Sequence, residues 1–162
     1  MSARAEALAD ELQAVTDEVA QFIETVPDAG WQAYVPDDQC TVAALVCHIA
    51  NSYNGMLANR IQPVVEGRDL APLALEMLNA WNAQAAEIYA GASKELAREI
   101  LAKNAAEAIA YIRTLDDDQL ALTFEIATRP GPVSIEDFIA GGLIGHPRGH
   151  LASARVAAGM AE

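Results

Sequence analysis

The sequence predicts an all-α protein, an up-and-down four-helix bundle with an extra short helix. Three observations lead to this fold class. Hydrophobic residues make up 52% of the chain, yet there are only three Phe and two Trp, and many of the rest are alanine, the best helix former. Several long segments repeat apolar residues at steps of three and four, and strict strand-like alternation is missing. The 162 residues fit one domain, 1–162.

The first helix is expected from about Ala3 to Thr25, and Pro27 follows its end. Its apolar stripe is the most regular in the chain: Leu8, Leu12, Val15, Val19, Phe22 and Val26. Residues 28–40 read as a loop that Trp31 and Tyr34 anchor to the bundle. Thr41 is a suitable N-cap for a second helix that runs to about Ile61. The stripe of this second helix comprises Val42, Leu45, Val46, Ile49, Tyr53 and Met56, with His48 at its flank.

Residues 62–71 form a connection, and Pro72 suits the first turn of a third helical segment. The expected buried side of that segment is Leu75, Leu78, Trp81, Ala85, Ile88 and Tyr89. Ser93 can cap a further helix over about 94–115, whose apolar face includes the polar Asn104. The run Asp116–Asp118 then forms a solvated turn, and residues 123–132 form a crossover loop. The turn lacks the spacing and the closing glutamate of an EF-hand.

The final helix, 133–159, carries the residues that bear on chemistry. Ser134 is its expected N-cap, and Pro147 lies inside it, where it removes one backbone donor and can kink the helix. At 3.6 residues per turn, His146 and His150 share the apolar face of this helix, so both imidazoles point inward. Buried imidazole nitrogens need partners, and two histidines at this i, i+4 spacing can share one metal ion. The chain has one further histidine, His48, and we expect the three to meet.

Charge excludes some classes of function. Ten Lys and Arg against 23 Asp and Glu give a net charge of −13, which disfavours binding to nucleic acid. No apolar run is long enough to cross a membrane and the N-terminus does not resemble a signal peptide, so we expect a cytoplasmic protein. Cys40 and Cys47 should then stay reduced. Cys47 adjoins His48 but points about 100° away around the helix, which indicates a small core residue and not a metal ligand.

Three motifs in order resemble the DinB/YfiT-like superfamily. The segment from Thr41 to His48-Ile-Ala resembles the signature of the family's second helix, and His146-Pro-Arg-Gly-His150 resembles its fourth-helix HxxxH. Residues 113–120 resemble the turn before the family's crossover loop. The resemblance covers nearly the whole chain. It implies a four-helix bundle, usually dimeric, with a divalent metal held by His48, His146 and His150.

The resemblance also implies a class of activity. Characterised relatives include thiol-dependent S-transferases and mycothiol-dependent maleylpyruvate isomerases. We therefore expect a metal-dependent transferase or hydrolase that acts on a small molecule, with a low-molecular-weight thiol as co-substrate. The alternatives are a non-catalytic dimeric bundle with a binding or stress role, and a maleylpyruvate-isomerase-like enzyme.

Three neutral imidazoles with an open position are typical of a catalytic metal site, and these ligands favour zinc or nickel. Asn104 and Tyr111 are weaker candidates for binding substrate or orienting a ligand, and Glu107 could line the same cleft. For Asn104 a hydrogen-bonded core amide, and for Tyr111 plain packing, are the competing interpretations.

Overall fold

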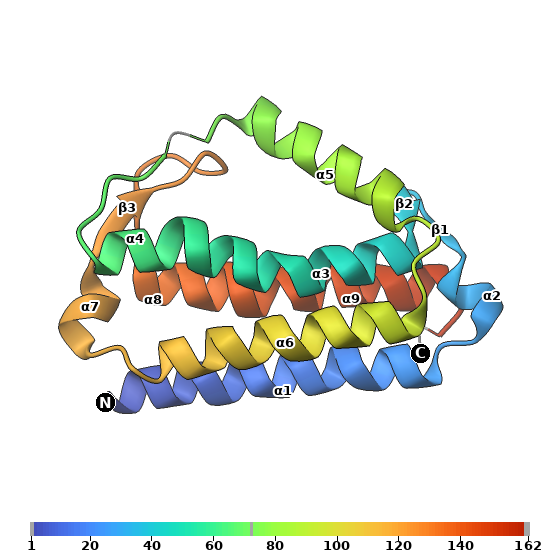
Figure 1. The fold of residues 1–162 in the computed structure, drawn as a ribbon, viewed down its shortest axis with the longest axis horizontal. Coiled ribbons are helices and arrows are strands. Elements are labelled where there is room, and N and C mark those ends of the chain that lie inside the picture. The colour runs from blue at the N-terminus through green and yellow to red at the C-terminus, as the bar shows by residue number, and fades with distance from the viewer. Residues whose placement is uncertain (1, 72, 161–162) are drawn as a thin grey trace.

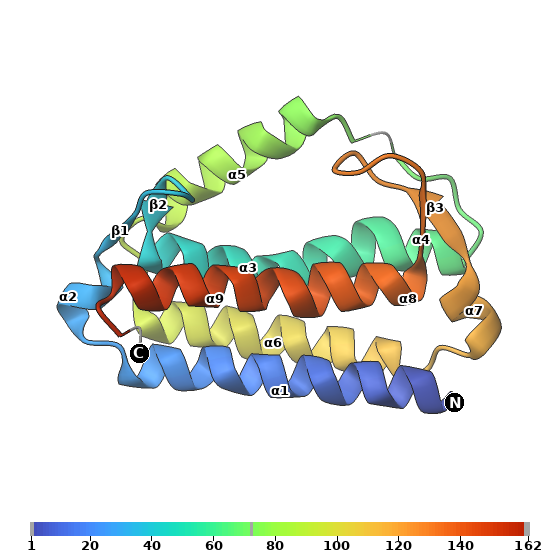
Figure 2. The same cartoon turned by 180° about the vertical axis from the view of Figure 1, so that it is seen from behind.

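The computed structural model describes residues 2–71 and 73–160. Pro72, expected in the first turn of the third helix, lies outside them. Long helices lie side by side in a bundle, which confirms the predicted all-α four-helix bundle (Figures 1 and 2). The bundle consists of α1 (Ala3–Thr25), α3 (Val42–Met56), α6 (Lys94–Ile112) and a C-terminal rod made of α8 (Ile135–Phe138), η2 (Ile139–Gly145) and α9 (His146–Ala157).

The helix directions follow from one long connection. The chain leaves α3 at one end of the bundle, and α5 (Leu75–Tyr89) carries it back along the molecule before α6 begins (Figure 1). As a result α3 and α6 run in the same direction, while α1 and the C-terminal rod run in the opposite one. The bundle thus contains two parallel pairs of neighbours, α3 with α6 and α1 with the C-terminal rod, so the four long elements do not alternate strictly up and down along the chain.

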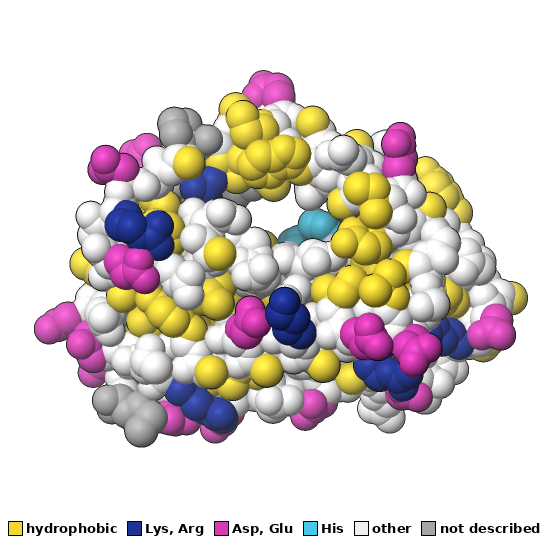
Figure 3. All heavy atoms as spheres, in the orientation of Figure 1, with side chains coloured by type: hydrophobic (Ala, Val, Ile, Leu, Met, Phe, Trp, Pro, Cys, Tyr) yellow, Lys and Arg dark blue, Asp and Glu magenta, His cyan; other side chains and the backbone are white. Residues whose placement is uncertain are grey.

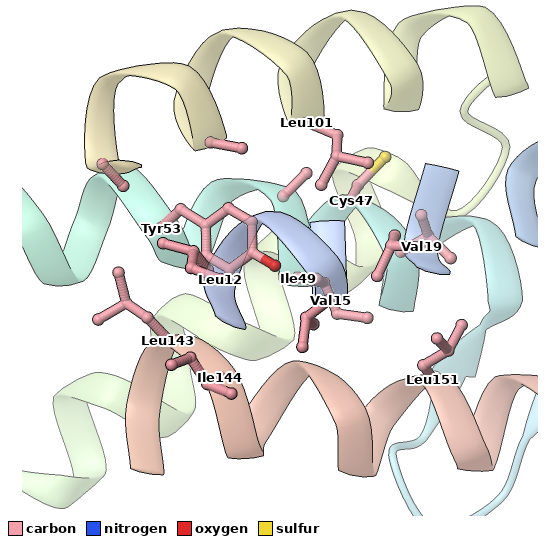
Figure 4. Close-up of a cluster of buried hydrophobic side chains, with 14 of the residues drawn as sticks. Leu12, Val15, Val19, Cys47, Ile49, Tyr53, Leu101, Leu143, Ile144 and Leu151 are labelled. Carbon is pink, nitrogen blue, oxygen red and sulfur yellow. The ribbon is translucent and has the colours of Figure 1, made fainter. Parts of the chain in front are cut away.

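The core lies between the four long elements (Figure 4). Ser2 caps α1, since its hydroxyl accepts hydrogen bonds from the backbone N–H groups of Arg4 and Ala5. The apolar stripe of α1 then faces α3, α6 and the C-terminal rod. Side chains from all four elements interdigitate there, including Leu12, Val15, Val19, Ile49, Tyr53, Leu101, Leu143, Ile144 and Leu151.

Residues 28–40 hold more structure than the expected loop. They form α2 (Asp28–Trp31) and strand β1 (Tyr34–Val35), which pairs antiparallel with β2 (Cys40–Thr41). Trp31 is an anchor as predicted, because it is buried and its indole N–H donates to the carbonyl of Ala92 at 2.7 Å. The same prediction for Tyr34 is wrong, since its side chain is 58% exposed. At the strand its side chain points away from the bundle.

The segment after α6 also gains short elements. Asp116 ends the turn that follows α6 and caps α7 (Asp117–Ala121) through a capping box with Gln119. The expected loop 123–132 contains β3 (Thr123–Glu125), which pairs antiparallel with β4 (Pro132–Ser134).

Two of the expected helices widen into π-helix. The second helix continues from α3 through η1 (Leu57–Ile61) into α4 (Gln62–Val65), four residues beyond its expected end. In the C-terminal rod, η2 ends directly before His146, one residue ahead of Pro147, and the N–H of His146 donates to the carbonyl of Gly141. The rod remains straight overall (Figure 2). Pro147 can kink a helix, but the structure has wider helical turns before it instead.

The prediction for α5 is wrong in one respect. Its apolar side was expected to be buried, but no residue of α5 is buried. Leu75, Trp81 and Ile88 are 46%, 55% and 66% exposed. The reason is that α5 is held at its C-terminal end, where the Thr41 hydroxyl donates to the carbonyl of Ala90 at 2.8 Å, while its N-terminal half diverges from α3 (Figure 1).

In the described part of the chain, none of the helices has both the length and the apolar character needed to cross a bilayer.

Candidate metal centre

Three histidines from two helices converge between α3 and α9. His48 Nε2 lies 3.2 Å from His146 Nε2, and His150 Nε2 lies 2.9 Å from the same atom. All three candidate ligand atoms lie within 4.8 Å of one another. The geometry therefore brings together the residues that the sequence selected.

The local structure of α3 positions His48, and that of α9 positions His146 and His150. Thr41 caps α3 by accepting the N–H of Ala44, which fixes where the helix begins. His48 then lies at the flank of the buried stripe and is half-buried, not enclosed. On α9, one turn of helix separates His146 from His150, so both rings project from the same face.

The arrangement fits a divalent metal. In tetrahedral coordination with metal–nitrogen bonds of about 2.0–2.1 Å, two ligand nitrogens lie about 3.3 Å apart. The two Nε2–Nε2 distances here are close to that value. Burial, with a smaller contribution from His150, lowers the pKa of His48 to about 4 and that of His146 to about 3. Both imidazoles are therefore neutral at pH 7, which is the form that binds metals.

A carboxylate that the sequence analysis did not select completes the site. Asp38 Oδ1 lies 2.9 Å from His150 Nδ1, and both side chains are largely buried. When Nδ1–H donates to Asp38, the free electron pair of His150 is on Nε2, directed at the other two histidines. Asp38 reaches this position from the turn between β1 and β2, where Gln39 adopts a positive φ of 53°. In the sequence, Asp38 stands out only as a member of the acidic pair Asp37-Asp38, and no local pattern links it to His150.

His146 has an unusual environment. Its Nδ1 is buried and has no hydrogen-bond partner among the residues described. Its Nε2 lies between those of the other two histidines. The Nε2 atoms of His48 and His150 both face the Nε2 atom of His146. A neutral imidazole has one N–H donor and one acceptor nitrogen, so the single Nε2 of His146 cannot form a full hydrogen bond with both neighbours. A cation at the meeting point would resolve this conflict.

The weaker candidates lie elsewhere. The Asn104 side chain is buried and its amide donates to the carbonyl of Ala50 at 2.9 Å, so it links α6 to α3 as a core amide. Tyr111 and Glu107 line a separate hollow between α6 and η1, together with Asn54, Leu57, Gln62, Ala110 and Thr114. None of the three histidines lines that hollow.

The two cysteines are also outside the cluster. Both are buried and unpaired, and burial raises the pKa of each thiol to about 11. Cys47 points into the core, toward Leu101 and away from the C-terminal rod, as expected (Figure 4).

Comparison with known families agrees with the fold and the motif order. The family model of the DinB superfamily matches residues 11–154, which include all three histidines. The chain belongs to the DinB superfamily.

Solved structures place this DinB superfamily member among similar bundles. YfiT from Bacillus subtilis, described as a probable metal-dependent hydrolase with an unusual four-helix bundle topology, superposes with a TM-score of 0.76 at 20% identity, over 99% of this chain and 91% of that chain. An uncharacterised protein from Clostridium difficile 630 superposes with a TM-score of 0.74 at 13% identity, over 96% of both chains. At these identities the likeness shows the fold alone. No curated protein matches the sequence significantly.

Proposed function

We propose that this protein is a metal-dependent enzyme in which His48, His146 and His150 hold one divalent ion, zinc or nickel. The observation that carries the proposal is the convergence of three Nε2 atoms from α3 and α9. The description of YfiT as a probable metal-dependent hydrolase supports the same chemistry for a protein of the same fold.

A metal bound by three histidines lowers the pKa of a coordinated water or thiol and so supplies a nucleophile at neutral pH. The protein's own residues prepare this chemistry. Burial keeps His48 and His146 neutral, and Asp38 holds His150 in the tautomer whose Nε2 faces the others. The half-buried position of the three rings limits water around the reacting atoms while it leaves them reachable by a small substrate.

The nucleophile has to come from solution. Cys40 and Cys47 are buried, and each thiol has a raised pKa of about 11, so neither supplies a thiolate near neutral pH. Water would make the protein a hydrolase, and a low-molecular-weight thiol would make it an S-transferase. We favour these two reactions over a purely binding role because three protein ligands would leave a fourth position on the ion open to water or thiol, as in catalytic sites.

The first test is elemental analysis of protein purified without chelator. We expect about one metal ion per chain in the wild type and loss of the ion in His48→Ala and in His150→Ala. Tyr111→Phe is the control, because Tyr111 lines a different hollow and should leave the metal content unchanged. Absence of metal from the wild type after addition of zinc or nickel would overturn the proposal.

A second assay separates the two reactions. Loaded protein is offered a chromogenic ester, and separately a chromogenic electrophile with a panel of small thiols. If the protein hydrolyses the ester but does not turn over the electrophile, it is a hydrolase. If it turns over the electrophile only when a thiol is present, it is a transferase. The homodimer and the cytoplasmic location stay predictions, and sedimentation equilibrium measures the first.

A further inference from the structure

Among the residues that the structure describes, the apolar side of α5 has no packing partner along its N-terminal half. Leu75 and Trp81 are about half exposed, and Leu78 is only partly covered. An amphipathic helix normally buries its apolar stripe. An apolar stripe that stays exposed to solvent is therefore typical of a surface that binds a ligand or another molecule.

The partly buried residues show which side of α5 faces the bundle. Ala86 and Tyr89 pack against the core. At 100° per residue, Leu78 lies within about 20° of Tyr89 around the helix, and Leu75 within about 40°. Met77 lies about 120° from Tyr89, on a different side. Leu75 and Leu78 therefore continue the inward side of α5 beyond the part that touches α3.

That inward side lies across an opening from the metal centre. α5 arches over α3 and the C-terminal rod in both ribbon views (Figures 1 and 2). The space-filling view shows a hollow beneath the arch, with hydrophobic side chains of α5 above it and histidine at its edge (Figure 3). One space thus has the candidate metal ligands at one side and an apolar helix face at the other.

We propose that this opening holds the apolar part of the substrate, an aliphatic or aromatic group that lies against Leu75 and Leu78 while the polar reacting group lies at the three histidines. The inference rests on the proposed function, which makes the histidines the reacting end. The inward stripe of α5, Leu75, Leu78, Asn82, Ala85 and Tyr89, carries no ionised side chain, so it favours an uncharged group. The substrate class is then a small molecule with an apolar body and one polar, metal-directed end.

Two metal-directed probes that differ in an apolar group test this directly. Acetohydroxamate and benzohydroxamate share the metal-binding end, and only the second carries a phenyl ring. Calorimetry on metal-loaded wild type should give about tenfold tighter binding of benzohydroxamate, the scale expected for partial burial of a phenyl ring. In Leu75→Ala/Leu78→Ala that advantage should fall to about twofold or less, with acetohydroxamate unchanged.

Met77→Ala is the matched control, because Met77 is on the same helix and is 44% exposed but on another side. It should keep the full advantage of benzohydroxamate. The same ratio of affinities in wild type and the double variant would overturn the inference. So would a double variant that converts a dimer into a monomer in sedimentation, since the stripe would then be an interface between two copies.

A measurement on metal-free protein tests the apolar subsite independently of metal binding, on which the proposed function rests. Metal-free protein is titrated with benzyl alcohol, and backbone amide NMR shifts are followed. We expect shifts in α5 and around His48 that disappear in the double variant and persist in Met77→Ala. If no metal binds but these shifts appear, the proposed function fails and the apolar subsite stands. If metal binds and the shifts are absent, the subsite fails.

Discussion

Asp38 and His150 form a contact of 2.9 Å between a turn near the start of the chain and the last helix. The contact joins the β1–β2 turn to α9 beside the three histidines, so one carboxylate controls the orientation of one candidate metal ligand. Partners of this kind fix the tautomer and ring direction of histidines that bind metals, and their loss typically weakens metal affinity 10–100-fold. Asp38 is thus a positioning residue of the proposed site.

Asp38→Asn tests this role with little change in shape. An amide keeps a hydrogen bond to Nδ1 but removes the negative charge that favours the correct tautomer, so we expect zinc affinity to fall about 10–100-fold. Competition titration with a chromogenic chelator measures the affinity. Asp37→Asn is the control, because Asp37 is exposed and adjoins Asp38. Equal affinities for the two variants would show that the Asp38 contact only stabilises the turn.

The low pKa values of the histidines predict how metal-free protein responds to acid. In the unfolded chain histidine binds a proton near pH 6.5, whereas the folded-state pKa is about 4 for His48 and about 3 for His146. The unfolded state therefore binds more protons below pH 6.5, and folding stability falls as pH falls toward 4. The limit is about 1.4 kcal/mol per pH unit for each histidine.

Urea unfolding at pH 7.0 and pH 5.5 measures this slope before most carboxylates titrate. His48→Gln should show a shallower fall than the wild type, because one of the two groups has been removed. A stability that is the same at both pH values would contradict the assignment of neutral, buried imidazoles.

The sequence predicted the bundle and the convergence of the histidines, because these depend on a local period or on motif order. Periodicity also placed Asn104 on an apolar face, but it left open whether this amide packs in the core or lines the site. Periodicity identifies the apolar side of a helix but does not say what covers it. That is why Leu75 and Trp81 were expected to be buried and are exposed. The prediction that Tyr34 anchors the loop was wrong for a related reason. Tyr34 belongs to a two-residue strand, and the direction of that strand turns its side chain outward.

Other features depend on contacts that no local pattern encodes. Asp38 meets His150 only because the β1–β2 turn lies against α9 in the folded protein. Likewise η2 depends on which carbonyl accepts each backbone N–H of the rod, such as the bond from His146 to Gly141, and the average helix period cannot show this. Pro147 indicated that the helix would be disturbed near this position, but the sequence did not indicate the type of turn.

The two cysteines should be unreactive in the folded protein. Each thiol has a pKa raised to about 11, chiefly by burial, so at pH 8 only about one molecule in a thousand carries the thiolate at either position. We expect slow reaction of Cys40 and Cys47 with Ellman's reagent in buffer and rapid reaction of both in urea. A thiol that reacts within seconds in the native protein would contradict this prediction and reopen a role for cysteine as nucleophile.

Adjacent glycines in η2 give a matched pair of substitutions near the metal centre. A Cβ at Gly141 would meet nothing within 4 Å, whereas a Cβ at Gly142 would lie 3.0 Å from Met56 Sδ. Gly141→Ala should stabilise the protein by about 0.5–1 kcal/mol, since alanine loses less backbone entropy in a helix. Gly142→Ala forces Met56 to move and should be at least about 1 kcal/mol less stable than Gly141→Ala.

Thermal and urea unfolding of both variants measure the difference, and a double-mutant cycle identifies its cause. Met56→Ala removes the sulfur, so in its presence Gly142→Ala should recover the gain seen for Gly141→Ala. Additive effects of the two substitutions would show that Met56 and Gly142 are not coupled. Because Met56 lies on the helix that bears His48 and Gly142 lies one turn before His146, such coupling would link α3 to the C-terminal rod beside the proposed metal ligands.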